Sequence, residues 1–246
     1  MFRSVCQKCF CLGLLTLAIL FTSVAGSALP QKRKPLRVLL VGGGASHDFN
    51  KWYKGADVKT LEENGFARVT YTDQPAEILG HLAETDVLVL SNNQPIPDEA
   101  TRKAIFDFLD RGKGVVLLHA AIWYNWKDWP EYNREIVGGG SAGHEKYGSF
   151  RVIPTPGKKH PIMKGIPGEF SLEDELYFHK IDPGGAKVDV LASAQKPGKT
   201  ETFPSIFTVA HPKGRIAAIA LGHDAASHEL DIYRTLLRNT VRWAAR

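Results

Sequence analysis

Four histidines follow apolar runs or lie in glycine-rich segments, and imidazole readily binds metals or moves protons near neutral pH. His119 closes the apolar run in GVVLLHAAIW. His47 follows the apolar run at residues 36–41, and His223 follows the one at residues 215–221. His144 lies in a glycine-rich segment, residues 138–148, that is expected to be a loop. Imidazoles together with one carboxylate are a normal ligand set for zinc or a similar divalent metal. We therefore predict a divalent metal site.

Carboxylates supply the acidic partner of this site, and a cluster of three spans residues 173–175. A metal can polarise a keto or hydroxyl oxygen while a neighbouring Glu or His moves the proton. The predicted metal ligands are His119, His144 and His223. The predicted catalytic residues are Glu175, as the base, and His47; either one could also complete or orient the metal site. Asp48 and Asp224 are predicted to orient the ligands.

Each of these histidines has a second interpretation, as a hydrogen-bonded residue of the core or of a loop. The chain contains no HExxH motif and no close histidine pair, so the ligands would come from distant segments. The other five histidines have flanks typical of surface loops or helix ends. They are His81, His160, His179, His211 and His228.

An aromatic cluster follows His119 directly in the sequence. Three of its members are candidate substrate-binding residues: Trp123, Trp126 and Tyr132. One interpretation is a platform for a sugar, because pyranose C–H faces pack well on aromatic rings. The other is packing against a sheet. The sequence leaves both open, with a small carbohydrate as the predicted partner.

Several chemistries are excluded or disfavoured. All three cysteines lie before residue 12, in a predicted leader, so the mature chain has no cysteine nucleophile or thiolate ligand. The glycines 42–44 do not continue as GxGxxG into a helix, so no nucleotide cofactor is expected. There is no GxSxG nucleophile elbow.

The first 25 residues have the features of a signal peptide. Arg3 and Lys8 form a basic region, the charge-free apolar run Phe10–Val24 follows, and small residues mark a cleavage site. We expect export to the periplasm or medium, with a flexible segment over 26–35 and no membrane span after cleavage; the alternative is an uncleaved membrane anchor. Losing the leader lowers the formal net charge from +5 to +3, which indicates no nucleic-acid partner.

Apolar runs and helical patterns alternate through the first half of the mature chain. Strands are expected at 36–41, 67–71, 86–90 and 114–118, and helices at about 52–64, 75–82 and 98–112. Later strands are expected at 148–154, 188–194, 205–209 and 215–221, the last two as a hairpin, and a final helix at 230–245. Residues 124–140 are expected to form a short helix with a long loop. This alternation predicts one α/β domain over 36–246, a parallel sheet with helices on both faces.

Ordered motifs along the mature chain resemble the trehalose-utilisation ThuA-like family. They are Gly43-Gly44 with His47-Asp48-Phe49; Leu118-His119-Ala120-Ala121 with Trp123; Tyr132-Asn133 with Gly138-Gly139; His144; His160-Pro161; Asp174-Glu175-Leu176-Tyr177; Gly214-Arg215; Leu221-Gly222-His223-Asp224; and Trp243-Ala244.

The resemblance implies a flavodoxin-like fold similar to that of class I glutamine amidotransferases, and a link to catabolism of carbohydrates such as keto-disaccharides. His119 stands where amidotransferase relatives carry a cysteine nucleophile, which excludes thioester chemistry here. The predicted function is carbohydrate chemistry that is metal-assisted or acid–base. A non-catalytic carbohydrate-binding module or a degenerate scaffold are the alternatives, and a homo-oligomer is left open.

Overall fold

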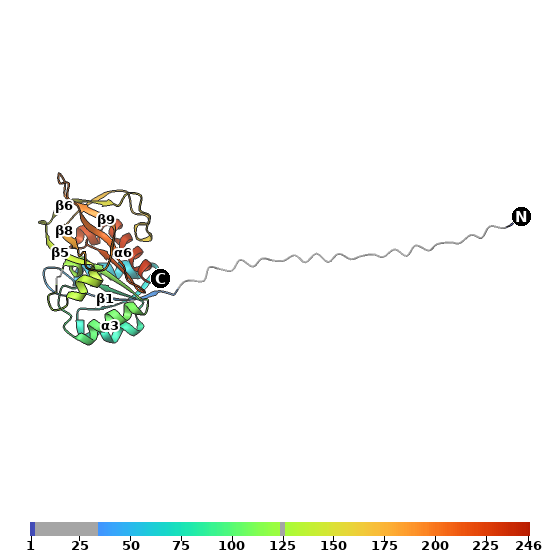
Figure 1. The fold of residues 1–246 in the computed structure, drawn as a ribbon, viewed down its shortest axis with the longest axis horizontal. Helices are drawn as coiled ribbons and strands as arrows, with labels where there is room; N and C mark the ends of the chain where they lie inside the picture. Colours follow the sequence, from blue (N-terminus) through green and yellow to red (C-terminus); the bar gives the residue numbers. More distant parts are fainter. Residues whose placement is uncertain (3–33, 124–125) are drawn as a thin grey trace. The chain divides into compact units, whose positions relative to one another are not determined.

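The fold of this chain comes from a computed structural model, which describes residues 1–2, 34–123 and 126–246. The predicted signal peptide and the segment that follows it lie outside the described residues, apart from residues 1–2 and 34–35. The chain divides into Met1–Lys34 and Pro35–Arg246, and the second unit carries the fold described below (Figure 1).

A nine-stranded mixed sheet forms the centre of this unit. Its order is β2 (Ala67–Thr72), β1 (Leu36–Val41), β3 (Val87–Leu90), β4 (Gly114–Leu118), β11 (Arg215–Ile219), β10 (Phe203–Val209), β9 (Val188–Gln195), β6 (Gly148–Pro154) and β7 (Phe170–Asp174). The strands from β2 to β11 pair in parallel, whereas those from β11 to β7 pair antiparallel. A separate two-stranded sheet joins β5 (Gly139–His144) to β8 (Tyr177–Ile181).

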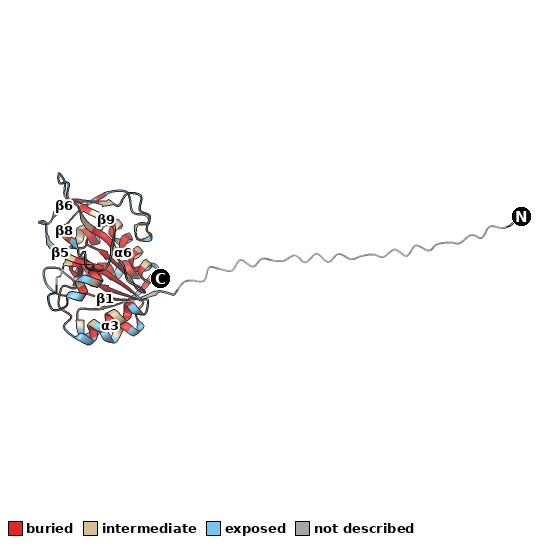
Figure 2. Cartoon of the chain, viewed as in Figure 1, coloured by how far each residue is buried: buried red, intermediate tan, exposed pale blue. Residues whose placement is uncertain are grey.

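The central strands are buried on both faces because successive side chains point to opposite sides of a sheet. In β1, Val38 and Leu40 enter one apolar cluster, while Leu39 and Val41 enter the other. One cluster is covered by α6 (Asp231–Ala244) and by the pair η1 (Asn50–Asp57) and α1 (Val58–Glu62). The other lies under α3 (Glu99–Asp110) and η5 (Tyr132–Val137). Figure 2 shows the buried strands between helices that expose their outer faces.

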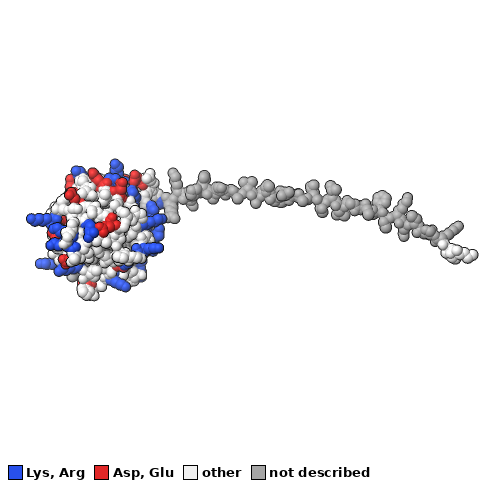
Figure 3. All heavy atoms as spheres, turned by 90° about the horizontal axis from the view of Figure 1, so that it is seen from above, with Lys and Arg blue, Asp and Glu red and all other residues white. Residues whose placement is uncertain are grey.

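Short helices complete the connections. They are η2 (Glu63–Gly65), η3 (Pro75–Glu77), α2 (Ile78–His81), η4 (Leu82–Glu84), α4 (Ala120–Trp123), η6 (Pro161–Met163) and α5 (Ala225–His228). Among the described residues, no helix is long and apolar enough to cross a membrane. Basic and acidic side chains both lie on the face of the protein drawn in Figure 3.

The predicted α/β fold with helices on both faces of a central sheet is confirmed, as is the hairpin between β10 and β11. The sheet was expected to be parallel, and it is parallel only from β2 to β11, with antiparallel strands added beyond. The glycine-rich segment that holds His144 was expected to be a loop, and this is wrong. It forms β5, because its backbone pairs with β8 despite the low strand propensity of glycine. The strands β7 and β8 were not predicted either. The expected helix over 52–64 begins at Asn50 and is π-helical as far as Asp57.

The topology brings distant loops to one edge of the sheet. Since β1, β4 and β11 run in the same direction, their carboxyl ends share that edge, where open α/β sheets bind ligands. The loops that leave these three ends carry His47, His119 and His223.

The start of α3 gives a test of this fold. Asp98 accepts hydrogen bonds from the Thr101 backbone N–H at 2.7 Å and from its hydroxyl at 2.6 Å, so it caps the helix. We expect Asp98→Ala to lower the folding equilibrium constant roughly fivefold, because the cap is lost. Urea unfolding measures this change. Asp107→Ala, which removes only an exposed ion pair with Lys103, should change the midpoint much less. Equal effects of the two substitutions would contradict the capping role.

Candidate active site

His119 stands at the end of β4 in a strained backbone conformation. Its φ is +36°, which non-glycine residues rarely adopt. Its N–H donates to the Ile219 carbonyl at 2.8 Å, and its carbonyl accepts from the Ile122 N–H at 2.9 Å. These bonds fasten the residue between β4, β11 and α4. Such strain persists only when the surroundings fix it, and it often marks functional positions.

Four side chains from separate segments meet at this point. His47, His119, Glu175 and His223 each direct one ligand atom into a common centre, and these atoms lie within 4.8 Å of one another. The Glu175 Oε2 is 3.6 Å from His119 Nε2 and 3.4 Å from His223 Nδ1. His119 is fully buried, and Glu175 exposes 16% of its side chain. The arrangement is a compact, largely enclosed centre of three imidazoles and one carboxylate.

Backbone carbonyls orient two of the imidazoles. His119 Nδ1 lies 2.8 Å from the Ala220 carbonyl, and His47 Nδ1 lies 3.2 Å from the Ala45 carbonyl. A carbonyl only accepts, so both rings carry their proton on Nδ1. The Nε2 lone pairs therefore face the centre, as they do when a metal-binding histidine donates its other ring N–H to a carbonyl.

Two buried nitrogens of this centre are left unsatisfied. His47 Nε2 and His223 Nδ1 have no hydrogen-bond partner among the described residues. A buried polar atom without a partner is costly, so such an atom calls for an explanation. In a tetrahedral site with bonds of about 2.0–2.1 Å, ligand atoms lie about 3.4 Å apart. The distances from Glu175 to His119 and His223 are of that size, so the donor set fits a divalent cation.

The electrostatics also favour cation binding. Burial raises the pKa of Glu175, but the neighbouring His119, His223 and His144 lower it more, to about 2, so the carboxylate is ionised at neutral pH. Burial, together with the neighbouring His119, lowers the pKa of His47 to about 4. His47 is therefore neutral near pH 7, with its lone pair available.

Tyr177 lies against His119 and escaped the sequence analysis as a site residue. Its hydroxyl donates to His119 Nε2 at 3.0 Å, and the two rings stack with centroids 4.5 Å apart. Burial raises the pKa of Tyr177 well above 10. The phenol therefore remains a donor, positioned within the centre. An aromatic residue two positions after Glu175, at the start of β8, was the available signal.

Asp174 was also missed, although it connects the two sides of the site. One carboxylate oxygen accepts from the Glu175 N–H at 2.6 Å. The other accepts from the Gly222 N–H at 2.8 Å and from the Ser227 hydroxyl. Asp174 occupies a buried position in the alternating pattern of β7. A carboxylate at a position where the strand otherwise buries apolar side chains would have indicated such a role.

The Gly222 peptide is held from its carbonyl side too. Its carbonyl accepts from the Tyr53 hydroxyl at 2.7 Å and from His228 Nε2 at 3.0 Å. His228 Nδ1 also lies 2.7 Å from Asp57 Oδ1. Both ring nitrogens face acceptors, so this imidazole is protonated. Burial alone would lower the pKa of His228, but the Asp57 carboxylate raises it.

Gly222 has φ +130°, a conformation that suits glycine, and it directly precedes His223. The hydrogen bonds to its N–H and its carbonyl therefore determine where the His223 side chain starts. His223 and Glu175 are coupled through Asp174, which holds the backbone of both segments.

His144 lies at the rim rather than among the four side chains of the centre. Its Nδ1 is 2.7 Å from the Glu145 carbonyl and 3.7 Å from Glu175 Oε1, and 35% of its side chain is exposed. Asp48 and Asp224 bind backbone near helix starts in the structure, and Asp224 is the cap residue of α5. Asp48 accepts from the Lys51 N–H at 2.9 Å. Asp224 accepts from the Ala226 N–H at 3.0 Å and from the Tyr147 hydroxyl at 3.1 Å.

The candidate aromatic residues separate into two groups. Trp123 lies at the site, with its ring 5.0 Å from His144 and 5.3 Å from Tyr177. Trp126 and Tyr132 are buried in the core under the sheet, 2% and 0% exposed, with ring centroids 4.5 Å apart. For these two, the structure favours packing over a sugar platform. Tyr147, which the sequence analysis did not single out, is exposed 5.5 Å from the His223 ring.

One of the five remaining histidines was placed wrongly. His179 lies inside β8, 2% exposed and stacked on Phe207 at 4.7 Å, rather than on a surface loop or at a helix end. His228 ends the helix α5, where it is fully buried in the pair with Asp57. His160 and His211 do serve at turns, where each Nδ1 accepts a backbone N–H.

His179 makes a pH-dependent contribution to stability. Burial lowers its pKa to about 4, whereas an unfolded histidine titrates near 6.5. Stability is therefore complete above about pH 6.5 and falls as the pH drops from 6.5 towards 4, by about 3 kcal/mol from this residue. We expect His179→Leu to remove that part of the slope in urea unfolding between pH 7 and 4. An unchanged slope would contradict the assignment.

Comparison with known proteins agrees with this fold. The sequence profile of a family described as ThuA, trehalose utilisation, matches residues 37–244. A putative ThuA-like protein from Parabacteroides merdae ATCC 43184 has a similar structure, with a TM-score of 0.74 and 24% identity over 86% of this chain and 90% of that one. A second, from Bacteroides uniformis ATCC 8492, has a TM-score of 0.72 and 20% identity, covering 89% and 94%.

More distant structures share the fold alone. A structure described as Agd3, a novel carbohydrate deacetylase, has a TM-score of 0.57 and 11% identity, and the match covers 85% of this chain but 32% of that one. No curated protein is significantly similar to this chain in sequence.

Proposed function

This chain belongs to the ThuA family of trehalose utilisation, and on that premise we propose that it is an exported enzyme that acts on a keto-disaccharide or glycoside through a divalent metal held at the His–Glu centre. Membership of the family implies a carbohydrate-related function. The reaction, the metal and export are our proposal.

One observation carries the metal part of this proposal. Two buried nitrogens, His47 Nε2 and His223 Nδ1, have no partner among the described residues and lie in the same centre as an ionised Glu175. A cation would satisfy both nitrogens and neutralise the buried carboxylate. His47, His119 and His223 would hold it, with Glu175 as a fourth ligand or as the base. Bound there, a divalent cation would polarise a keto or hydroxyl oxygen of the sugar.

The side chains of the chain itself would orient the sugar and move the proton. Glu175 is ionised, so it accepts a proton rather than donating one. Tyr177, still protonated, would turn its O–H from His119 Nε2 towards a substrate oxygen once that nitrogen is engaged. Trp123 and Tyr147 lie beside the centre and would contact the apolar face of a sugar.

Elemental analysis of the purified protein tests the metal. We expect about one divalent ion per chain, lost on His119→Ala or His47→Ala because each removes a lone pair from the centre. His211→Ala, at a surface turn, is the matched control and should keep the full stoichiometry. If the parent protein holds no stoichiometric metal, or if His119→Ala binds it equally well, the proposal is wrong.

Turnover separates an enzyme from a binding module. A metal-loaded enzyme should release product from a 3-keto-disaccharide or glycoside, and a chelator should abolish the reaction. Saturable binding without product, with or without added metal, would favour the non-catalytic carbohydrate-binding module that uses the same aromatic side chains.

A further prediction concerns Asp174, which positions Glu175 and His223. We expect Asp174→Asn to weaken metal affinity about 10- to 100-fold, because an amide cannot accept all three hydrogen bonds at once. Competition with a chromogenic chelator measures the affinity, and circular dichroism checks the fold. Glu173→Gln, one residue earlier and exposed, is the control. Unchanged affinity in a folded Asp174→Asn protein would contradict the role.

A further inference from the structure

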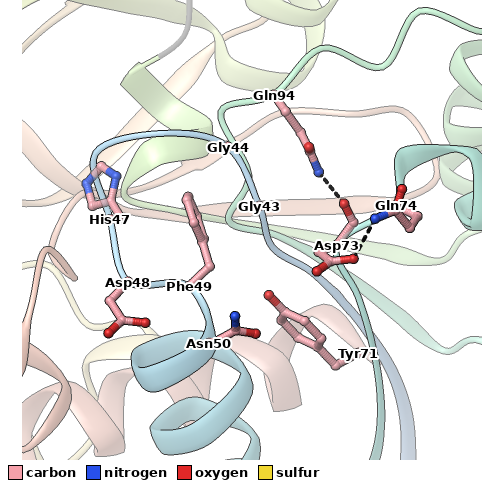
Figure 4. Close-up of a pocket in the computed structure, with 10 residues that line it drawn as sticks. All are labelled: Gly43, Gly44, His47, Asp48, Phe49, Asn50, Tyr71, Asp73, Gln74 and Gln94. Carbon is pink, nitrogen blue, oxygen red and sulfur yellow. Dashed lines mark hydrogen bonds between the residues drawn. The ribbon is translucent and has the colours of Figure 1, made fainter.

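A polar pocket opens beside His47 at the ends of β1, β2 and β3. We call it the His47 pocket; its lining includes His47, Asp48, Tyr71, Asp73, Gln74 and Gln94. Its volume is about 330 Å³, within the range of small-molecule sites. Figure 4 shows His47 on one side of the glycine loop and Asp73 with Gln74 on the other.

The sheet topology accounts for the position of this pocket. The chain passes from β1 to β2 on one side and then to β3 on the other, so the strand order reverses at β1. Ligands of open α/β sheets bind in the crevice at such a point. His47 belongs both to the pocket and to the metal-binding centre, so the two share a wall.

The pocket is built from fixed backbone. The Gln94 amide donates to the Gly42 carbonyl at 3.1 Å and to the Asp73 carbonyl at 2.6 Å, and so joins the loops after β1 and β2. Gly43 has φ +104°, and a Cβ there would lie 2.5 Å from Gln94 Nε2. A glycine at this position lets the loop approach the amide closely.

The lining offers donors and acceptors that match hydroxyl groups. The Tyr71 hydroxyl is buried without a hydrogen-bond partner in the described part of the chain, and it points towards the glycine loop (Figure 4). Asp73 Oδ1 lies 2.8 Å from Gln74 Nε2, and Asp48 adds a second carboxylate. A sugar hydroxyl both donates and accepts, so it can pair with carboxylate, amide and phenol groups together.

The negative charge of the pocket disfavours sugars that carry an anionic group. Two carboxylates line it, and no Lys or Arg is among the lining residues. Lys54 lies over the Tyr71 ring, with Nζ 5.6 Å from its centroid, but does not line the pocket. A phosphate or carboxylate group on the ligand would meet like charge there, and the lining holds no Lys or Arg to compensate it.

From this we propose that the His47 pocket binds a glycosyl unit of the substrate that carries no anionic group and places the next unit at the His–Glu centre. The inference rests on the proposed function and narrows it. The substrate is an unphosphorylated, non-acidic disaccharide or glycoside, held at its non-reacting unit by Tyr71 and Asp73.

Equilibrium binding of sugars to the metal-free protein tests the assignment of the His47 pocket without requiring turnover. The probes are trehalose, maltose and methyl glucosides, with trehalose 6-phosphate as the charged probe, measured by calorimetry or saturation-transfer NMR. We expect at least one neutral probe to bind, and trehalose 6-phosphate to bind at least about tenfold more weakly than trehalose.

Tyr71→Phe removes one oxygen atom that has no described protein partner, so the thermal midpoint should not fall. We expect this substitution to raise the Kd of the neutral probe about 5- to 20-fold, the effect of losing one buried hydrogen bond. Asp73→Asn should reduce the preference for trehalose over its 6-phosphate. Lys159→Ala, at a separate surface hollow, is the control and should change neither value.

Several outcomes would overturn the inference. These are no saturable binding of any neutral probe, tighter binding of trehalose 6-phosphate than of trehalose, or a Kd insensitive to Tyr71→Phe. If the metal-loaded protein converts a sugar and Tyr71→Phe leaves its kcat/KM unchanged, the pocket assignment fails while the proposed enzyme stands. If the pocket binds sugar as expected but no product forms with any metal, the enzymatic proposal fails instead.

Discussion

The site depends on one buried carboxylate, that of Asp174. It accepts hydrogen bonds from Glu175, Gly222 and Ser227, which belong to segments far apart in the sequence. A polar group buried without hydrogen-bond donors would be destabilising, so the burial of Asp174 and the approach of these segments depend on each other. The Tyr53 hydroxyl and His228 complete this arrangement at the Gly222 carbonyl. Glu175 and His223 are therefore held by backbone contacts that involve neither of their own side chains.

The two halves of the sheet contribute different chemistry. The parallel half supplies the three imidazoles, because β1, β4 and β11 end at the same edge. The antiparallel half supplies the carboxylate and the phenol, where β7 ends and β8 begins. β7 lies at the far edge of the sheet order, yet the chain leaving it returns to the centre, where β8 pairs with β5. Neither half alone would assemble the centre.

The sequence predicted the parallel half well, because buried parallel strands are continuous apolar runs bounded by glycine and charge. The run that ends at His119 is an example. It also indicated His47, His119, His223 and Glu175 as site residues, and the structure brings these four together. The pairing of strands that lie far apart in the chain could not be predicted from the sequence. β5 contains Gly139, Gly140 and Gly143, so its propensity is that of a loop, and only its register with β8 makes it a strand.

The same limit applies to the buried histidines, whose burial the sequence did not reveal. His228 is buried because Asp57, 171 positions away, accepts from it, and no local pattern around either residue indicates that pair. Asp174 and Tyr177 were visible as residue types, but their long-range partners come from the segments that follow β11 and β4. The position of His144 at the rim follows from the path of β5, which the sequence did not reveal. Local chemistry could be predicted, whereas the pairing of buried polar groups depends on tertiary contacts.

The surroundings of His119 bear on whether it attacks a substrate or holds one in place. Resemblance to the amidotransferase fold puts it where relatives carry a nucleophile, and its positive φ agrees with such an elbow. An attacking group needs an accessible lone pair, but this ring is fully buried. Its Nδ1 proton is committed to the Ala220 carbonyl and its Nε2 faces Tyr177 and Glu175. Strain at the elbow would then serve to hold Nε2 in the centre, which is the requirement for a ligand rather than for a nucleophile.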